Sequence, residues 1–418
     1  MEEVEALEIG VRHALSGKQL PSVSLRASES LLTLREEVGR AIGARSFLSV
    51  KLLLGGSLLP SEGSLATAGL CTGSVVDVIQ TFRLRVLSSS RDCTARLWSA
   101  ETGECLQTLE GHNLPVAAAT FSPDASLVAS ASDDCTARLW EADSGLCSAV
   151  LEGHRQGLTS IAFSRDGALL ATASRDRTAR VWSVESGRCL CVCNGHCGMV
   201  SEVAFSPSGR ALATASTDQL ARTWSVETGD ALQVLSGHTG TCAAVSFSAD
   251  DAQVLTASSD TTARLWNARD GCCIHRLEGH SAAVNQAIFS PCERLVATSS
   301  LDKTASVWSV ETGERLHVLL GHGDFLFSVA FSSDGQHLVT ASKDCTARVW
   351  NAATGECRQV LLGHSYALLS AAFAPDGLAV VTISYDYTAR IWSAFTGQCV
   401  HKLEGHGGLW NTVAFSMQ

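Results

Sequence analysis

The chain has 418 residues and a formal net charge of -11 at pH 7. Its length allows more than one domain, and its apolar residues can fill a large core. Nucleic acids and anionic membranes are bound through basic patches, so the acidic balance disfavours both as partners. No stretch has the length and hydropathy of a signal peptide or a membrane span, and we expect a cytoplasmic protein.

The first part of the chain mixes strand and helix signals. Alternating apolar residues predict a hairpin over residues 7–25, and short apolar runs predict strands at 50–54 and 75–80. Thr33 and Glu36 have the spacing of a capping box, which predicts a helix that starts at Thr33. A hairpin followed by a helix and further strands is the order of a small α+β domain of the β-grasp type.

This segment resembles ubiquitin and the ubiquitin-like proteins. The matching pieces are ALSGK at 14–18, TLREEVGRAIG at 33–43, KLLLGGSLL at 51–59 and SLATAGLCTGSVVDVIQ at 64–80. The resemblance implies a ubiquitin-like domain over residues 5–81, and the missing Gly-Gly tail implies an integral module. The family binds partners through an apolar patch, which falls here on Leu15, Leu53 and Ile79. Leu53 and Ile79 are equally compatible with ordinary core positions in strands.

From residue 83 onward one pattern recurs with a period of 42 residues. Each copy holds a Gly-His pair, a strand ending in Phe, a small-residue strand such as ATAS, an aspartate, and a tryptophan six positions after it. The tryptophans are Trp98, Trp140, Trp182, Trp224, Trp266, Trp308, Trp350 and Trp392. A period of about 40–45 residues with these features is typical of a propeller blade.

The copies resemble WD-type repeats, most clearly in ALLATASRDRTARVWSVESGRCL at 168–190. The resemblance implies a mainly β fold, with an eight-bladed WD40-type β-propeller over residues 82–418. The first copy lacks an inner strand, whereas residues 409–415 form a lone inner strand. We therefore expect a composite first blade, built from 83–109 and 409–415, which closes the propeller and covers two exposed sheet edges.

Each copy repeats a His, a Ser, an Asp and the Trp. In WD-type blades the resemblance implies a structural tetrad that runs from Trp to Ser to His to Asp. The predicted members in the first two copies are His406, Ser90, Asp92 and Trp98, and His112, Ser132, Asp134 and Trp140. Hydrolytic catalysis needs one exposed nucleophile beside an oxyanion hole, not eight copies between strands. We therefore predict an architectural role, no catalytic residues and no enzyme.

Most of the sixteen cysteines keep one of two phases of the repeat, so equivalent ones lie on different blades, too far apart to pair. We expect them to be small buried residues in a reducing compartment. Cys191, Cys193, His196 and Cys197 have a spacing that could hold zinc. His196, however, is already required by the repeat, and we expect neither a metal nor a cofactor.

Three positions in each copy face one rim of the channel in WD-type proteins: the third and fifth after the His, and the one before the Asp. One group of these is aromatic, aliphatic or cationic apart from one asparagine: Phe325, Phe327, Lys343, Leu369, Tyr385, Leu409, Asn411, Arg91 and Leu301. The remaining rim positions are small and polar. This composition favours docking of a protein or peptide over the first group. Alternatively, Phe325 and Phe327 fill the channel.

We interpret the chain as a non-catalytic scaffold or adaptor. Its rim would bind a client protein or peptide, and its ubiquitin-like domain would recruit a second factor. The blades are similar to those of dynein-assembly and cilium factors. The alternative is a substrate receptor of a cullin-type ubiquitin ligase, because Trp266-Asn267-Ala268-Arg269 keeps the arginine, though not the aspartate, of that family's motif. The pattern leaves the oligomeric state open.

Overall fold

The computed structural model describes residues 6–13, 19–41, 50–55, 57–59, 64–80 and 84–416. The chain divides into two compact units. The first comprises Met1–Arg85 and Ser99–Glu104, and the second comprises Val86–Trp98 and Cys105–Gln418. Among the helices of these described residues, none is long and apolar enough to cross a membrane.

The first unit is a five-stranded sheet with one helix, α1 (Leu31–Ala41), packed against it. The strands are β1 (Ala6–His13), β2 (Gln19–Arg26), β3 (Val50–Leu54), β4 (Ser57–Leu58) and β5 (Val75–Gln80), in the order β2-β1-β5-β3-β4. β1 and β5 run parallel, and the other neighbouring strands are antiparallel. Leu31, Leu34 and Val38 of the helix share one apolar cluster with Ile9 and Val76 of the sheet.

The helix begins earlier than the predicted capping box at Thr33, so that prediction was wrong. Ser30 is the capping residue, because its Oγ accepts a hydrogen bond from the Thr33 amide at 3.1 Å. Ser30 Oγ also lies 2.9 Å from Thr33 Oγ1. Leu31, the first residue of the helix, is buried in the core.

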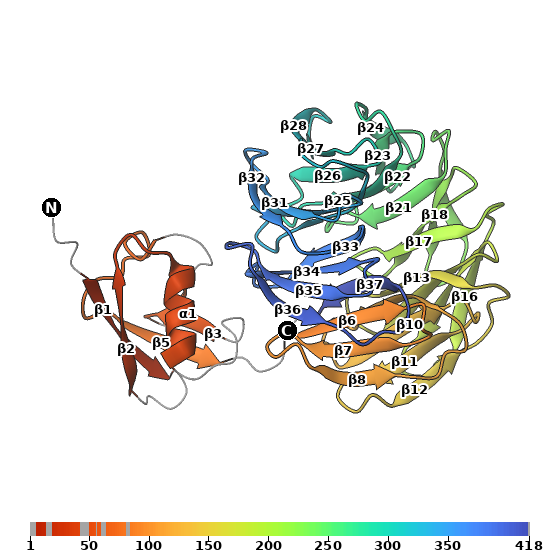
Figure 1. Cartoon of the computed structure of the whole chain (residues 1–418). Coiled ribbons are helices and arrows are strands. Elements are labelled where there is room, and N and C mark those ends of the chain that lie inside the picture. Colours follow the sequence, from red (N-terminus) through yellow and green to blue (C-terminus); the bar gives the residue numbers. More distant parts are fainter. Residues whose placement is uncertain are drawn as a thin grey trace. The chain divides into compact units, whose positions relative to one another are not determined.

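The second unit consists of four-stranded antiparallel sheets, eight of them within the described residues (Figure 1). Seven are built from consecutive strands. They are β9 (Val116–Phe121), β10 (Leu127–Ser132), β11 (Ala137–Glu141) and β12 (Cys147–Leu151); β13 (Leu158–Phe163), β14 (Leu169–Ser174), β15 (Thr178–Ser183) and β16 (Cys189–Asn194); β17 (Val200–Phe205), β18 (Ala211–Ser216), β19 (Ala221–Ser225) and β20 (Ala231–Leu235); β21 (Cys242–Phe247), β22 (Gln253–Ser258), β23 (Ala263–Asn267) and β24 (Cys273–Leu277). The others are β25 (Val284–Phe289), β26 (Leu295–Ser300), β27 (Ala305–Ser309) and β28 (Arg315–Leu319); β29 (Leu326–Phe331), β30 (His337–Ser342), β31 (Ala347–Asn351) and β32 (Cys357–Leu361); and β33 (Leu368–Phe373), β34 (Ala379–Ser384), β35 (Ala389–Ser393) and β36 (Cys399–Leu403).

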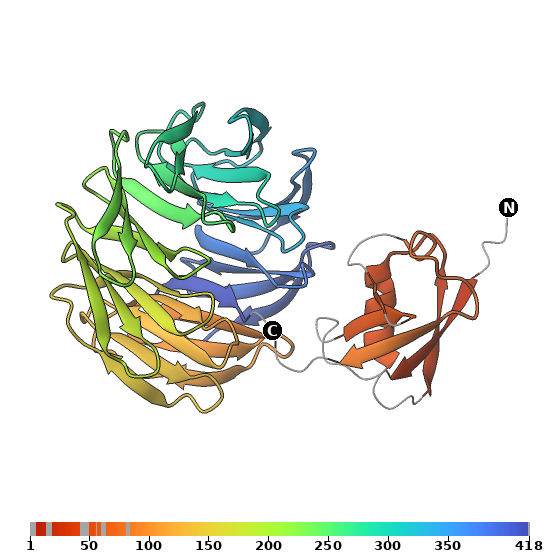
Figure 2. The same cartoon turned by 180° about the vertical axis from the view of Figure 1, so that it is seen from behind.

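The remaining sheet joins distant parts of the sequence. It contains β37 (Trp410–Phe415), β6 (Arg85–Ser90), β7 (Ala95–Ser99) and β8 (Cys105–Leu109), in that order. β37 pairs antiparallel with β6, from Trp410 opposite Ser90 to Phe415 opposite Val86. The first strands of successive sheets contact one another around a common centre, and β37 contacts both β33 and β9 (Figures 1 and 2).

The apolar core lies between neighbouring sheets. Leu97 and Leu109 of one sheet, for example, pack with Val128 and Trp140 of the next. The repeated tryptophans are almost completely buried. Small residues on the second strands let adjacent sheets approach closely enough for this packing. Each sheet therefore buries its apolar face only with its neighbour's help, as expected for a repeat protein.

The cysteines correct one expectation. All sixteen are free thiols. Six of them are exposed rather than buried. Each is the first residue of an outermost strand: Cys105, Cys147, Cys189, Cys273, Cys357 and Cys399. The outermost strand has no further strand beside it, so its first residue lies in solvent. Cys191, Cys193 and Cys242 are buried.

Candidate functional site

A chain of hydrogen bonds crosses the sheet that contains β37. Trp98 Nε1 donates to Ser88 Oγ at 2.8 Å. Ser88 Oγ lies 2.9 Å from His406 Nε2, and His406 Nδ1 lies 2.8 Å from Asp92 Oδ2. Thr94 Oγ1 donates to the other oxygen of Asp92 at 2.7 Å. The four side chains of this tetrad come from β6, β7, the turn between them, and the loop before β37.

The same geometry recurs in the following sheets. Trp140 Nε1 and His112 Nε2 each lie 2.8 Å from Ser130 Oγ, and His112 Nδ1 lies 2.8 Å from Asp134 Oδ2. In the later copies a threonine supplies the hydroxyl: Thr172, Thr214, Thr256, Thr298, Thr340 and Thr382.

The predicted serines of the tetrad were wrong by two positions. Ser90 Oγ accepts from the Asp92 amide at 3.2 Å, and Ser132 Oγ accepts from the Asp134 amide at 3.1 Å. Residues two apart in a strand share one face. The serine within the strand meets the indole and the imidazole, whereas the serine at the strand end, Ser90 or Ser132, stabilises the turn.

The protonation states follow from burial. Burial lowers the pKa of His406 and outweighs the attraction of Asp92, which would raise it. Burial alone would raise the pKa of Asp92, but hydrogen bonds from His406, Thr94 and the Gly407 amide together hold this pKa below its usual range. A neutral imidazole with its proton on Nδ1 gives every donor of the tetrad an acceptor. The tetrad is thus a satisfied network buried between strands, without a solvent-facing nucleophile.

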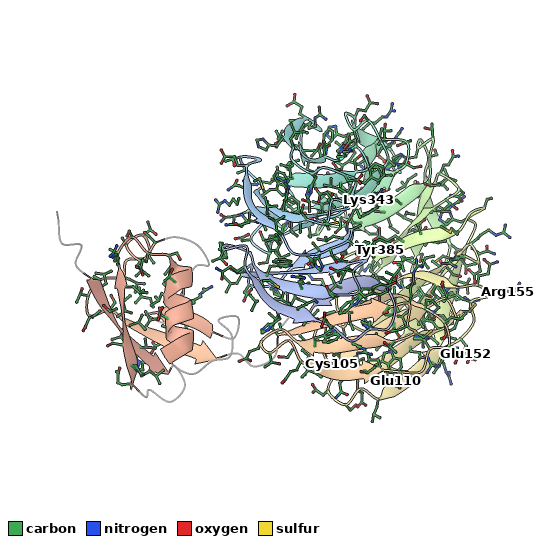
Figure 3. All side chains as sticks on the ribbon, viewed as in Figure 1. Cys105, Glu110, Glu152, Arg155, Lys343 and Tyr385 are labelled. Atoms are coloured by element: carbon green, nitrogen blue, oxygen red, sulfur yellow. The ribbon has the colours of Figure 1, made fainter. Side chains whose placement is uncertain are left out.

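A cavity of about 620 Å³ lies at the N-terminal ends of the strands β29, β33 and β37. Its lining residues are Phe327, Lys343, Tyr366, Ala367, Tyr385, Tyr387 and Leu409. The chain has only three tyrosines, and all three line this cavity. Lys343 and Tyr385 lie toward the middle of the second unit (Figure 3). We call these seven residues the tyrosine cavity.

Several predicted rim residues belong to this region. Phe327, Lys343, Tyr385 and Leu409 line the tyrosine cavity. Phe325 lies beside it, with its ring centroid 4.9 Å from Lys343 Nζ, a cation–π distance. The Phe325 side chain remains 37% exposed, which is unusual for phenylalanine.

Besides Phe325, four predicted rim residues do not line the cavity: Asn411, Leu369, Leu301 and Arg91. Asn411 Nδ2 donates to the Val116 carbonyl at 2.7 Å and thereby links the inner strands of two sheets. Leu369 and Leu301 are half-buried, and Arg91 is exposed.

The three-position pattern missed Tyr366 and Tyr387. Tyr366 is the second residue after His364 and 64% exposed, and Tyr387 follows the turn residue Asp386. Neither position belongs to the rim set. All tyrosines of the chain lie at positions 366, 385 and 387, in two neighbouring turns. This clustering is the sequence signal that could have identified both residues.

Two exposed leucines occur in the loops that lead to the cavity-lining strands. Leu320 and Leu362 directly precede a Gly-His pair and are 69% and 68% exposed. The other copies have polar residues there: Glu110, Glu152, Asn194, Ser236, Glu278 and Glu404. Glu110 and Glu152 lie at the periphery of the second unit (Figure 3). The two leucines occur in the loops that also carry Phe325 and Tyr366.

The predicted patch on the first unit lies partly beyond what the structure describes. Leu15 is outside the described residues. Leu53 is half-buried and its backbone pairs with Leu58 and Asp77. Ile79 pairs with Lys51 through its backbone, and its side chain is outside the described part.

The histidine of the cysteine-rich segment 191–197 belongs to a tetrad. His196 Nδ1 lies 2.8 Å from Asp218 Oδ2, and His196 Nε2 lies 2.7 Å from Thr214 Oγ1, so both ring nitrogens are engaged. Among the residues that the structure describes, no three His, Cys, Asp or Glu side chains lie close enough together to bind a metal ion.

The family model of the WD domain, G-beta repeat, matches seven segments: 103–141, 145–183, 187–225, 229–267, 271–309, 313–351 and 355–393. The chain belongs to the WD40 family. Each match covers the outermost strand of one sheet and the first three strands of the next sheet. Each of these WD repeats therefore spans two sheets. WD40 repeats generally mediate protein–protein interaction, and their propellers are generally non-enzymatic scaffolds.

Among solved structures, the crystal structure of the computationally designed Ika8 protein is similar to this WD40 chain. The TM-score is 0.68 and the sequence identity 28%, over 74% of this chain and 93% of the designed one. Among curated proteins, none matches the chain.

Proposed function

We propose that the chain is a non-catalytic adaptor. In this proposal an eight-bladed WD40 propeller binds a partner protein or peptide at the tyrosine cavity, and an N-terminal ubiquitin-like domain recruits a second factor. The observation that carries it is the meeting of all three tyrosines with Phe327, Lys343 and Leu409 in one cavity.

The propeller of the proposal is a ring closed by β37. Two observations support closure. β37 hydrogen-bonds along β6, and it also contacts β33 on one side and β9 on the other. A closed ring leaves no unpaired inner edge, which gives the cavity a rigid frame. A rigid frame lowers the entropy that a binding site loses when a partner docks.

The chemistry of the tyrosine cavity suits a protein partner. Tyrosine side chains give a large apolar contact area and a hydroxyl while fixing few rotatable bonds, and they are enriched among interface hot spots. Lys343 adds one cation beside Phe325. The exposed Leu320 and Leu362 extend the apolar surface beyond the cavity. Exposed apolar side chains gathered in neighbouring loops are typical of an interaction site.

The test compares partners recovered by affinity purification. Phe327→Ala combined with Tyr385→Ala removes two walls of the cavity. Ser201→Ala combined with Thr217→Ala changes the positions equivalent to Phe327 and Tyr385, here in β17 and in the turn after β18 of the same sheet, and serves as the control. We expect the control to recover the wild-type partners, and the cavity variant to lose them while unfolding at the wild-type temperature. If the cavity variant recovers the same partners, the proposed site is wrong.

The second factor is assigned to the N-terminal domain. The arrangement of one helix against a mixed five-stranded sheet supports a ubiquitin-like fold. Leu53→Ala should therefore remove a different set of partners from the cavity variant. If both variants lose the same set, the two domains do not recruit separate factors.

A cullin-type substrate receptor is the second candidate. Arg269 is exposed, and Asn267 Oδ1 accepts from its amide at 2.8 Å, so this turn is ordered without the family's aspartate. Recovery of a cullin adaptor that is lost in Arg269→Ala would support this candidate. Recovery of dynein-assembly or ciliary proteins, unaffected by Arg269→Ala, would support the scaffold.

A further inference from the structure

The first residue of β37 differs in size and chemistry from its counterparts. Trp410 opens this strand, whereas the first strands of the other sheets open with an aliphatic residue or a cysteine: Val116, Leu158, Val200, Cys242, Val284, Leu326 and Leu368. All eight side chains are buried. Packing of the core therefore needs only an apolar group at this position, and it does not explain why one copy has an indole with a hydrogen-bond donor.

The ring of Trp410 is held on two sides within its own sheet. It stacks on Trp98, with ring centroids 5.6 Å apart and an interplanar angle of 20°. The His406 ring meets it edge-on, at a centroid distance of 4.7 Å. Aromatic pairs at such distances have defined geometries, so these two contacts restrict the orientation of the indole.

In this orientation the indole reaches the neighbouring sheet. Trp410 Nε1 donates a hydrogen bond to the Tyr387 carbonyl oxygen at 2.9 Å. Tyr387 lies in the turn between β34 and β35, and it lines the tyrosine cavity. Within the described chain, the carbonyl of the corresponding turn residue accepts a side-chain hydrogen bond in no other copy. This connection between neighbouring sheets is therefore particular to one repeat.

The last strand thus contributes to the cavity in two ways. Tyr387 has a left-handed backbone, with φ 65°, and is 52% exposed, so the hydrogen bond from Trp410 holds a residue with little packing around it. Leu409, directly before Trp410, lines the cavity itself. Its carbonyl accepts a hydrogen bond from the Arg91 amide at 2.8 Å, next to the pairing of β37 with β6. The start of β37 therefore supplies one wall and anchors a second.

We propose that Trp410 is a positioning residue of the tyrosine cavity, which makes partner binding depend on the pairing of β37 with β6. The inference rests on the proposed function of that cavity. A site that is already held in its binding shape loses less entropy when a partner docks. When β37 leaves its place, the Leu409 wall and the anchor of Tyr387 are lost together, so binding weakens even though the other sheets keep their structure.

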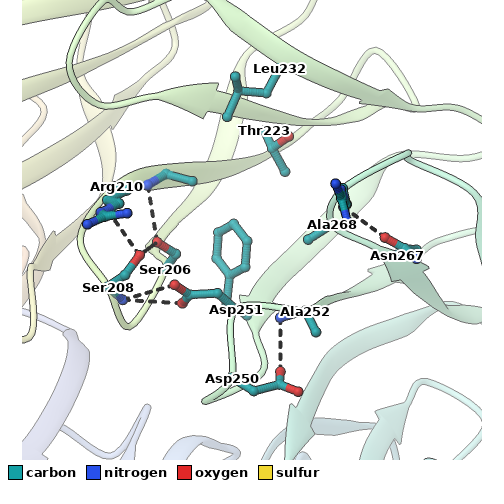
Figure 4. A pocket seen from close by; sticks show the side chains of 13 residues that line it. Ser206, Ser208, Arg210, Thr223, Leu232, Asp250, Asp251, Ala252, Asn267 and Ala268 are labelled. Carbon is teal, nitrogen blue, oxygen red and sulfur yellow. Dashed lines mark hydrogen bonds between the residues drawn. The ribbon is translucent and has the colours of Figure 1, made fainter.

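A second cavity provides a matched comparison. It has a volume of about 500 Å³ and lies between the sheet β17–β20 and the sheet β21–β24 (Figure 4). A hydrogen bond between neighbouring sheets occurs here too, because the Ser208 amide donates to both carboxylate oxygens of Asp251, at 3.2 and 3.3 Å. This cavity shares no lining residue with the tyrosine cavity. Asp251→Ala therefore breaks a connection of the same kind without changing the tyrosine cavity.

The first test observes the cavity itself. Because all three tyrosines of the chain line it, the full chain labelled with fluorotyrosine reports on the cavity by fluorine NMR, with each signal assigned by replacing one tyrosine with phenylalanine. Trp410→Phe keeps a ring beside Trp98 but removes the donor. We expect it to shift or broaden the Tyr387 signal more than the other two, whereas Asp251→Ala should change none. An unchanged Tyr387 signal in Trp410→Phe, or equal changes in all three signals, would overturn the proposal.

The second test measures binding of the partners that the wild-type chain recovers. Trp410→Phe should weaken it by roughly fivefold or more, which corresponds to one hydrogen bond. Trp410→Leu, with the residue that opens β29 and β33, should weaken it at least as much. Leu158→Val changes the corresponding position of β13 and lowers stability at a site outside the cavity, so its partner binding should match that of the wild type. Equal losses in Leu158→Val and Trp410→Phe would show a general effect of stability and contradict the positioning role.

The outcomes separate this inference from the function on which it rests. Suppose that Trp410→Phe shifts the Tyr387 signal but binds partners as the wild type does, while the variant with Phe327→Ala and Tyr385→Ala loses them. The role of Trp410 in binding is then wrong, and the proposed binding site stands. If the double variant keeps its partners, the proposed function fails, and the dependence of binding on β37 fails with it.

Discussion

His406 Nδ1 lies 2.8 Å from Asp92 Oδ2, although 314 positions separate the two residues. This contact connects the loop before β37 to the turn after β6. We expect His406→Ala to lower the free energy of unfolding by about 2–4 kcal/mol, because Ser88 and Asp92 would stay buried without their partner. Urea denaturation measures the change. Lys402→Ala, at an exposed site nearby, should cost less than about 0.5 kcal/mol, and an equal cost for both variants would contradict the prediction.

The hydroxyl of the tetrad can be tested in one repeat. Thr340 Oγ1 lies 2.8 Å from both Trp350 Nε1 and His322 Nε2. Thr340→Val keeps the shape but leaves both nitrogens without a partner, which should cost about 2–3 kcal/mol. Thr340→Ser keeps the hydroxyl, as Ser88 and Ser130 do in other repeats, and should cost less than about 1 kcal/mol. Similar melting temperatures for the two variants would show that the hydroxyl contributes little.

One repeat lacks a hydrogen bond that the others have. Leu220 stands where Thr262 and its counterparts donate to the turn aspartate, at 2.7 Å from Asp260 in the case of Thr262. Leu220→Thr should restore this bond to Asp218 and stabilise the chain by about 0.5–1.5 kcal/mol. Leu220→Val has the same shape as threonine without the hydroxyl. A gain of the same size in both variants would assign the effect to shape rather than to hydrogen bonding.

The residue after each turn aspartate has a left-handed backbone. Lys303 has φ 73° and Tyr387 has φ 65°. Such a conformation costs a non-glycine residue roughly 1–2 kcal/mol, so Lys303→Gly should stabilise the chain by about 1 kcal/mol. Tyr387→Gly should relieve the same strain but remove a wall of the tyrosine cavity. We therefore expect partner binding to weaken in Tyr387→Gly alone, and loss of binding in both variants would point to an indirect effect.

Acid should destabilise the second unit. Burial lowers the pKa of seven tetrad histidines below the ordinary 6.5: His112, His154, His196, His238, His280, His364 and His406. The unfolded chain then binds more protons than the folded chain, so stability is present above pH 6.5 and falls as the pH decreases below it. The turn aspartates add a second loss below their ordinary 3.8, since the pKa of Asp176 is lowered to about 2.

Calorimetry between pH 8 and pH 4 measures this effect. We expect a nearly constant melting temperature above pH 7.5 and a continuous decrease from about pH 6.5 downward. A melting temperature that rises between pH 7.5 and pH 5.5 would mean that the tetrad histidines are charged in the folded chain.

The repeat pattern predicted the four-stranded sheets because turn residues and alternation recur in every copy. It did not predict which serine belongs to the tetrad, because Ser88 and Ser90 lie on the same face of one strand. Only the position of the Trp98 indole, which donates a hydrogen bond to Ser88, distinguishes them. The cavities were outside its reach for another reason. Tyr366 and Tyr387 are not among the recurring positions of the repeat, and only the restriction of tyrosine to two neighbouring turns points to them. Which side chains enclose the space between them depends on how the loops of several sheets pack.

The pairing of β37 with β6 has a consequence during biosynthesis. β6, β7 and β8 leave the ribosome early, but the strand that completes their sheet follows some 300 residues later, at Trp410–Phe415. Until then β6 presents an unpaired edge, and such edges attract other strands. Incomplete chains that end before Trp410 are therefore expected to associate through this edge more readily than the full chain does.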